Sequence, residues 1–236
     1  MKPIHYTIAC AVLGATFVSS AEDKPVLPFQ IAGSNHVIVG VAWDPAAVQK
    51  MLPAGMKLAE GATGAINIYQ ASKGYGITPY QSVYFWVDVE GYDSPDGTKG
   101  RWMLAGAYGP QEKTSAALRE NGFPVRNGTS RFEATDQGKR AIGTVNGKDV
   151  VTVEIKSSSE PCDVASGLLK YPTMAANKLV VNEIPYVGDV CKAEPVSVTV
   201  TAPENDPFAA FKPVKTLWAV EFKNAAFSIN RPVAAK

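Results

Sequence analysis

The sequence predicts a mainly β, single-domain protein. Short apolar segments rich in β-branched and aromatic residues recur along the chain, turn residues separate them, and only two segments have the pattern of a helix. No repeat, low-complexity tract or linker divides the chain. Short strands with frequent turns are typical of a barrel-like, strongly curved antiparallel sheet.

Residues 1–21 have the pattern of a secretory signal peptide. Lys2 precedes an apolar run over residues 8–18, and Ser19-Ser20-Ala21 supplies the small residues of a cleavage site. The run is shorter than the roughly 20 residues that a membrane-spanning helix needs. We therefore expect a secreted or periplasmic domain over residues 22–236; a buried N-terminal helix is the alternative.

The charges of this domain are balanced. Removal of residues 1–21 takes away one of the 23 basic side chains, Lys2, and none of the 22 acidic ones. Nucleic-acid and membrane-surface partners normally require a basic excess, so we expect neither.

Two cysteines, Cys162 and Cys191, remain in the predicted exported domain. In an oxidising compartment such a pair favours a disulfide, which closes a loop and restricts the unfolded chain by roughly 3–4 kcal/mol. Two cysteines without nearby histidines do not make a zinc site.

The first predicted strand covers residues 36–43, an apolar run rich in β-branched residues. A short helix follows, because Asp44 can cap it and Pro45 suits its first position. The segment 52–56 ends this helix.

Strands dominate the rest of the chain, and residues 81–89 give the strongest signal. The glycine-, aspartate- and proline-rich composition of residues 91–100 predicts a loop. Residues 111–121 have the pattern of a helix, and Gly122 is expected to end it. Asn146-Gly147 predicts a hairpin turn. The other expected strands are 65–69, 101–108, 131–134, 139–145, 150–156, 179–186, 195–201 and 216–230.

The order of these segments and several short stretches resemble the acetoacetate decarboxylase family. The stretches are 44–60, 73–87, 116–127, 143–148 and 208–229. Within the third stretch, Arg119, Glu120, Phe123 and Pro124 match the family's G-R-E-x-x-x-(Y/F)-P-K-K signature. The resemblance covers nearly the whole predicted exported domain. It implies a small barrel-like domain with an interior pocket, often in a homo-oligomer.

The residues that carry the family's chemistry are replaced. The decarboxylases form a Schiff base on a lysine whose pKa a second lysine lowers. Val125 and Arg126 stand at these two positions, and neither can act as the amine nucleophile. The family's two pocket glutamates fall near Asn67 and near Tyr80 or Gln81. We therefore expect no Schiff-base decarboxylation and no cofactor.

No other lysine is an obvious substitute. Lys73, Lys99, Lys113 and Lys148 lie in predicted turns, loops or helix ends, where we expect them to be exposed.

The candidate catalytic residues come from the signature segment. If Arg126 points inward, its guanidinium can bind an acidic or enolate-like ligand in the pocket; the alternative is an exposed loop arginine. The resemblance implies that Arg119 and Glu120 belong to the wall of the pocket, which makes Arg119 a candidate carboxylate clamp; the alternative for the pair is a structural ion pair at a helix end.

The candidate ligand-binding residues follow the same alignment, and core packing is the alternative for the aromatic ones. Tyr84 and Trp86 share one face of their strand. His36 is the only histidine outside the signal segment and alone is weak evidence for catalysis. The candidates are Asn67, Tyr80, Gln81, Tyr84, Trp86, Phe123 and Val125.

Other motifs are absent or neutral. The sequence contains no nucleophile elbow, metal-ligand spacing or phosphate loop. Asn127-Gly128-Thr129 is a glycosylation sequon, which matters only in a eukaryotic source.

Three functions are compatible with these observations. The first is an exported protein that binds a small oxo acid or similar carbonyl compound and transforms it without a Schiff base, in lyase-like or hydrolase-like chemistry. The second is a non-catalytic binder of a small, partly apolar acid. The third is an unrelated secreted β-sandwich with a structural role.

Overall fold

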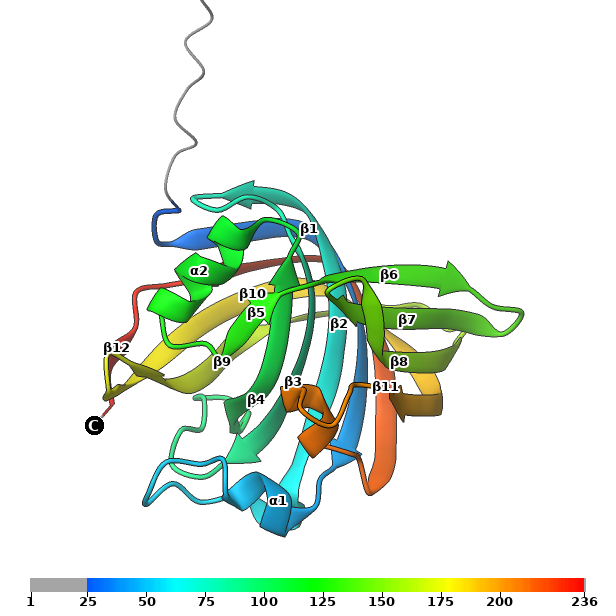
Figure 1. Cartoon of the computed structure of the whole chain (residues 1–236). Helices are drawn as coiled ribbons and strands as arrows, with labels where there is room; N and C mark the ends of the chain where they lie inside the picture. Colours follow the sequence, from blue (N-terminus) through cyan, green and yellow to red (C-terminus); the bar gives the residue numbers. More distant parts are fainter. Residues whose placement is uncertain (1–24, 236) are drawn as a thin grey trace, which may run out of the picture.

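The computed structural model describes residues 25–235, so the predicted signal segment 1–21 lies outside the described residues. The described chain is mainly β, with two short α-helices and one strongly curved sheet (Figure 1), as predicted. The strands are β1 (Phe29–Ala42), β2 (Thr63–Tyr75), β3 (Gln81–Val89), β4 (Gly100–Gly109), β5 (Val125–Asn127), β6 (Thr129–Ala134), β7 (Gly138–Val145), β8 (Lys148–Ser157), β9 (Asp163–Ala175), β10 (Lys178–Val200), β11 (Lys215–Ile229) and β12 (Val233–Ala234). The helices are α1 (Pro45–Gln49) and α2 (Glu112–Glu120), and the 3-10 turns are η1 (Glu60–Ala62) and η2 (Pro207–Ala210).

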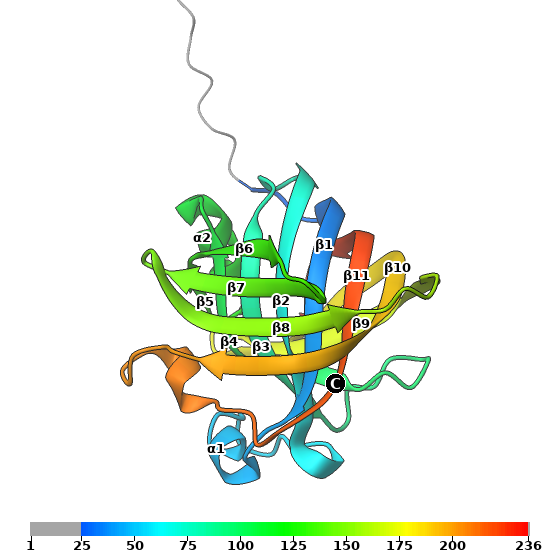
Figure 2. The ribbon, with the colours of Figure 1, turned by 90° about the vertical axis from the view of Figure 1, so that its right-hand side faces the viewer.

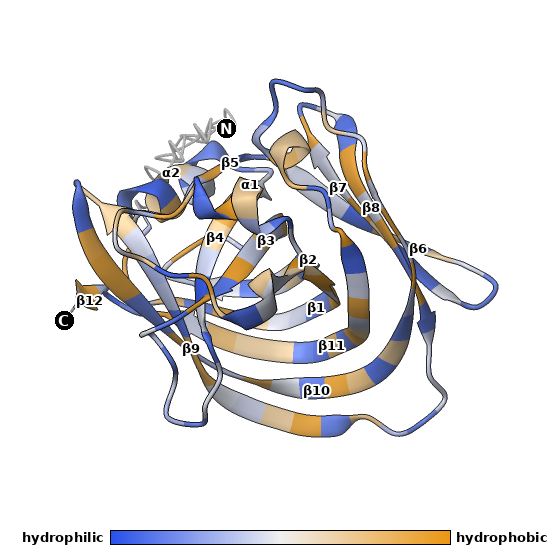
Figure 3. Ribbon diagram, turned by 90° about the horizontal axis from the view of Figure 1, so that it is seen from below, coloured by the Kyte–Doolittle hydropathy of each residue, from blue (hydrophilic) through white to orange (hydrophobic). Residues whose placement is uncertain are grey.

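The strand order is β5-β4-β3-β2-β1-β11-β10-β8-β7-β6, with β9 and β12 paired to β10 off this path. All pairs are antiparallel except β4 with β5. β1, β11 and β10 curve side by side around the interior (Figure 3). The sheet does not close, because β5 and β6 end the path without pairing to each other. The protein is therefore barrel-like in curvature but is not a closed barrel.

β10 joins the two halves of the sheet. Its first part pairs with β9 and its last part with β8. We predicted two strands here, 179–186 and 195–201, and this was wrong. Register shifts between Val187 and Asp189 and between Pro195 and Ser197 let one strand bend, and the second accommodates a proline that regular pairing excludes.

Three strands were not predicted: β5, β9 and β12. β9 carries Gly167 and Pro172 and lacks a regular apolar alternation, so its sequence gives no strand signal. Its pairing with β10 runs without a register shift from Asp163 to Ala175, which shows that tertiary context determines this strand.

The predicted disulfide is confirmed. Cys162 and Cys191 are bonded with their Cα atoms 4.2 Å apart. The bond lies beside the last pair of the β9–β10 ladder, where Asp163 faces Val190. It therefore fixes the start of β9 to the strand it pairs with.

The local signals for both helices are also confirmed. The Asp44 side chain accepts hydrogen bonds from the backbone N–H groups of Ala46 and Ala47, and Pro45 begins α1. Gly122 follows α2 with a φ of 85°, a conformation that favours glycine at a helix end.

The central strands β1, β2 and β3 have two different faces. One face is apolar and packs against β7 and β8, which cross over these strands (Figure 2). This first core includes Val37, Val39, Ile66, Ile68, Val83, Phe85, Val87, Val151, Val153 and Ile155. The opposite face carries aromatic and polar side chains and is turned toward β9, β10 and α2.

In the described part of the chain, no helix is long and apolar enough to cross a membrane.

Candidate functional site

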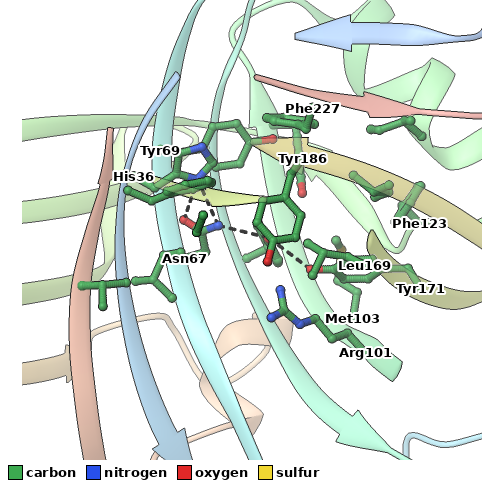
Figure 4. A pocket seen from close by; sticks show the side chains of 18 of the residues that line it. His36, Asn67, Tyr69, Arg101, Met103, Phe123, Leu169, Tyr171, Tyr186 and Phe227 are labelled. Atoms are coloured by element: carbon green, nitrogen blue, oxygen red, sulfur yellow. Dashed lines mark hydrogen bonds between the residues drawn. The ribbon is translucent and has the colours of Figure 1, made fainter. Parts of the chain in front are cut away.

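A cavity of about 320 Å³ lies between the second face of β1–β4 and the strands β9–β11 (Figure 4). Most of its lining is apolar or aromatic. It is lined by His36, Ile38, Asn67, Tyr69, Tyr84, Arg101, Met103, Tyr108, Leu118, Phe123, Ala165, Leu169, Tyr171, Ile184, Tyr186, Val190, Trp218, Val220, Phe222, Phe227 and Ile229.

Arg101, near the start of β4, is the only lysine or arginine in this lining. Its guanidinium carbon lies 4.5 Å from the centre of the Trp86 ring, a cation–π contact. Its Nε–H is buried without a hydrogen-bond partner in the described structure. Burial alone would lower the pKa of Arg101, but Tyr171, Tyr84 and Asp88 outweigh it and the pKa is raised. The cavity therefore contains a permanent cation with an unused donor.

Trp86 positions this cation although it does not line the cavity itself. Its Nε1–H donates to Asp88 Oδ1 at 3.2 Å, and Thr63 Oγ1 donates to Asp88 Oδ2 at 2.9 Å. Burial raises the pKa of Asp88 despite these hydrogen bonds. Both oxygens of this carboxylate accept hydrogen bonds from other residues, and Asp88 acts on Arg101 through its charge, so the Arg101 Nε–H stays without a partner.

The hydrogen bonds of His36 define its tautomer. Ser34 Oγ donates to the carbonyl of Ala225 at 3.0 Å, so it accepts at 2.9 Å from Nε2–H of His36. Nδ1 of a neutral ring is then an acceptor for the Asn67 amide, 3.2 Å away. Burial lowers the pKa of His36 to about 3, although its hydrogen bond to Asn67 opposes the shift. His36 is therefore neutral near pH 7.

Asn67 continues this chain into the cavity. Its Nδ2 also donates to Tyr84 Oη at 3.1 Å, and Tyr84 Oη lies 3.2 Å from Tyr171 Oη. The ring of His36 is stacked on Tyr69 with a centroid distance of 4.4 Å. These contacts fix side chains from β1, β2, β3 and β9 in one network.

The tyrosines around the cavity are hydroxyl donors rather than bases. Burial raises the pKa of Tyr69, Tyr84 and Tyr108 well above the ordinary value. These three tyrosines remain protonated near pH 7. At the same pH His36 is neutral, with both ring nitrogens in hydrogen bonds, and Arg101 is charged. The lining also contains no lysine, aspartate or glutamate. It thus offers positive charge and donors, but no efficient proton acceptor.

The structure brings three of the sequence-predicted ligand-binding residues to the cavity: Asn67, Tyr84 and Phe123. Trp86 lies outside the lining and contacts Arg101 through its ring. Tyr80 is buried beside Tyr69, with ring centroids 5.7 Å apart.

The remaining two lie elsewhere. Gln81 Oε1 accepts from the backbone N–H of Ser130 at 3.0 Å, so it connects β3 to β6. Val125 is buried in the core on the second face, the aromatic core, which includes Tyr69, Tyr84, Tyr108, Phe123 and Tyr171. It does not line the cavity.

The candidate catalytic residues lie outside the lining. Arg126 forms an ion pair with Asp206, and its guanidinium lies 5.3 Å from the ring of Phe208. Arg119 is exposed; it pairs with Glu112 and donates to the Val125 carbonyl at 3.3 Å. Glu120 is exposed at the end of α2.

The lysines considered as substitutes also lie outside the lining. Lys73, Lys99 and Lys148 are exposed, and Lys113 is half-buried. No group of three or more metal-binding side chains occurs in residues 25–235.

The sequence-based prediction missed Arg101 and Tyr171. Arg101 was placed correctly in a strand, and its alternation with Met103 was the available signal that both share a face. Tyr171 gave no such signal, because β9 was not predicted.

The fold is shared with solved structures. An acetoacetate decarboxylase from Legionella pneumophila is 13% identical, with a TM-score of 0.70 over 99% of this chain and 98% of that chain. The enduracididine biosynthesis enzyme MppR complexed with pyruvate is 14% identical, with a TM-score of 0.69 over 98% of this chain and 97% of that chain. An acetoacetate decarboxylase-like enzyme from Sphingomonas wittichii RW1 is 17% identical, with a TM-score of 0.60 over 89% of this chain and 93% of that chain.

No protein-family model and no curated protein sequence matches the chain. At these identities the likeness concerns the fold alone. The chain has the acetoacetate decarboxylase fold, as its sequence resemblance implied.

Proposed function

We propose that this protein binds a small oxo acid in its cavity without forming a Schiff base. One observation carries the proposal: Arg101 presents a buried, unused N–H to a largely apolar cavity. A carboxylate is the natural partner, because guanidinium–carboxylate hydrogen bonds are strong and planar. The tyrosine hydroxyls supply donors for a carbonyl oxygen of the same ligand.

The size and lining of the cavity define the ligand further. Its volume of about 320 Å³ is near the lower limit for small-molecule sites. Met103, Phe123 and Leu169 contribute apolar surface. A compact acid with an apolar body fits this environment. The binding of pyruvate by MppR, which has the same fold, supports a ligand of this class.

We propose binding rather than turnover as the principal role. General acid–base catalysis needs a group whose pKa lies near the working pH. The pKa of His36, about 3, lies far below it, and the raised pKa values of Tyr69, Tyr84 and Tyr108 lie far above it. A binding role needs only the fixed donors that these residues provide.

Export is part of the proposal. The N-terminal pattern of residues 1–21 and the Cys162–Cys191 disulfide both suit an oxidising compartment. Fractionation of cells that express the full chain, with N-terminal sequencing of the product, tests it. Cleavage after Ala21 and recovery outside the cytoplasm are expected, and an intact cytoplasmic chain contradicts export.

The direct test of binding replaces the cation. Isothermal titration with pyruvate and phenylpyruvate measures affinity in the parent, in Arg101→Met and in Arg131→Met. Loss of a charge-assisted hydrogen bond of about 1.5–3 kcal/mol predicts roughly 10- to 150-fold weaker binding for Arg101→Met. Arg131 is an exposed arginine outside the lining, paired with Asp149, so its variant controls for net charge. Equal affinities in all three proteins, or no saturable binding in the parent, contradict the proposal.

Borohydride trapping tests the absence of a Schiff base. We expect no mass adduct after treatment with pyruvate or acetoacetate, because the cavity lining contains no lysine. A stable adduct, located by peptide mapping, contradicts this part of the proposal and identifies the lysine responsible.

Stabilisation of an enolate is the second candidate function, favoured by the convergence of Arg101 with the Tyr84 and Tyr171 hydroxyls. Solvent water then takes the proton that the ligand loses from carbon, and the cavity contributes only the stabilisation of the enolate oxygen. Exchange of the ligand's α-hydrogens with deuterated water, followed by NMR, tests it. Exchange that the parent accelerates and Arg101→Met does not supports catalysis, whereas saturable binding without accelerated exchange supports the binding role.

A further inference from the structure

Trp218 is the one residue of the cavity lining that is exposed; the others are buried or half-buried. It lies on β11 and is 45% exposed. Its lining neighbours Val190 and Val220 are half-buried, whereas Tyr69 and Leu118 are buried. Trp218 therefore lies where the cavity meets the solvent.

The indole of Trp218 covers Gly40. The two residues are direct partners in the β1–β11 ladder, and a Cβ atom added to Gly40 would overlap the indole ring. Gly40 has no positive φ, so its backbone does not itself require glycine. The missing side chain thus creates the space into which the indole folds, as aromatic residues commonly do over strand glycines.

Trp218 forms no side-chain hydrogen bond and no aromatic pair among those found in residues 25–235. By contrast, Trp43 and Trp86 each donate through Nε1. A ring at the cavity mouth that has no side-chain hydrogen bond can move without breaking a polar interaction.

We propose that Trp218, seated on Gly40, is the gate of the cavity and sets the largest ligand that it admits. This deepens the proposed function and rests on it. The ligand class becomes an oxo acid with an apolar body no larger than a single ring. Acids with a two-ring body are excluded by the indole rather than by the cation.

The test measures how the affinity for a smaller and a larger acid depends on the side chain at position 218. Affinities for phenylpyruvate and indole-3-pyruvate are measured in the parent, Trp218→Ala and Leu217→Ala. Leu217 is the matched control: it precedes Trp218 on β11, is also exposed and does not line the cavity. Since a methylene-sized change in a pocket alters selectivity by about 10-fold or more, Trp218→Ala is expected to shift the affinity ratio toward indole-3-pyruvate by at least about 10-fold. Leu217→Ala is expected to leave the ratio unchanged.

Gly40→Ala tests whether the contact between Gly40 and the Trp218 indole holds the gate in place. Its methyl group displaces the indole, so the affinity ratio should shift in the same direction as in Trp218→Ala. In the Gly40→Ala/Trp218→Ala double variant no ring remains to be displaced, and the second change should add nothing. If Gly40→Ala does not fold, the Trp218→Ala result still decides.

A neutral probe separates failure of the gate from failure of the proposed function. The fluorescence of N-phenyl-1-naphthylamine, which has no carboxylate, reports access to the apolar cavity. From a titration with this probe we expect the affinity of Trp218→Ala for the probe to be at least about 10-fold higher than that of the parent and of Leu217→Ala. If neither the parent nor any variant binds an acid but the difference in probe binding remains, the gate is supported and the oxo-acid function is contradicted. If acids bind the parent and neither the ratio nor the probe responds to Trp218→Ala, the gate is overturned.

Discussion

The two faces of strands β1–β3 are built from alternate residues and differ in kind. On one face Val37, Ile66 and Phe85 pack into a continuous apolar core. On the other, His36, Asn67 and Tyr84 form a hydrogen-bonded network at the cavity. Each residue of the first set is adjacent in sequence to one of the second.

This difference shows how one segment can serve stability and binding together. The apolar face needs only volume and hydrophobicity, which many side chains supply. The cavity face needs defined donors and acceptors, because a buried polar atom without a partner is costly. Substitutions on the two faces should therefore be distinguishable by what they change.

The largest effect is expected on the apolar face. Phe85 is fully buried, with ring centroids 5.3 Å from Trp43 and 4.9 Å from Phe208. Phe85→Ala removes these contacts and should lower the free energy of unfolding by about 3–5 kcal/mol. Urea denaturation measures this loss, and phenylpyruvate affinity of the folded fraction should change little.

Tyr84→Phe is the comparison on the cavity face. It removes the hydroxyl that accepts from Asn67 and should lower the free energy of unfolding by only about 1 kcal/mol. A loss as large as that of Phe85→Ala would contradict the division between the faces.

The second prediction concerns pH. The pKa of His36 is about 3 in the folded protein and near its ordinary 6.5 when unfolded, so the unfolded state binds more protons between these values. The stability that His36 contributes is full above pH 6.5 and is lost as the pH decreases through this window, by about 1.4 kcal/mol per pH unit. Between pH 6.5 and 5 this amounts to about 2 kcal/mol.

His36→Gln removes this titration and provides the control. The difference in unfolding free energy between parent and variant should therefore vary with pH over 5–6.5. Glu221 does not interfere, because Lys139 and Ser157 outweigh its burial and lower its pKa, so its contribution is lost only below its ordinary value of 4.5. A difference that is constant over this range would show that His36 is not held neutral.

The apolar face was predictable from sequence and the cavity face largely was not. The strand 81–89 and the Asp44-Pro45 helix start were confirmed, because alternation and capping are local signals. The cavity instead combines Arg101 on β4 with Tyr171 on β9. No local pattern relates residues so far apart, and β9 itself carries no strand signal.

The signature segment shows the same limit. Alignment to the acetoacetate decarboxylase family places Val125 and Arg126 at the two lysine positions, but it does not give the direction of either side chain. The structure places both on β5, where successive side chains point to opposite faces. Since Val125 is buried in the aromatic core, Arg126 points away from it, toward Asp206 and Phe208.

Arg126→Met tests this direction of the Arg126 side chain and has the smallest expected effect of the three predictions. Asp206 is nearly buried and would lose its cationic partner, although it keeps the hydrogen bond from Phe208 N–H at 2.9 Å. We expect the free energy of unfolding to fall by about 1 kcal/mol, because Arg126 itself is partly exposed and solvent screens the pair. Affinity for phenylpyruvate, measured by titration, should stay within about twofold of the parent because the lost charge does not face the cavity. A loss of affinity comparable to that of Arg101→Met would show instead that Arg126 contacts the ligand, which requires β5 to turn its other face toward the cavity in the bound state.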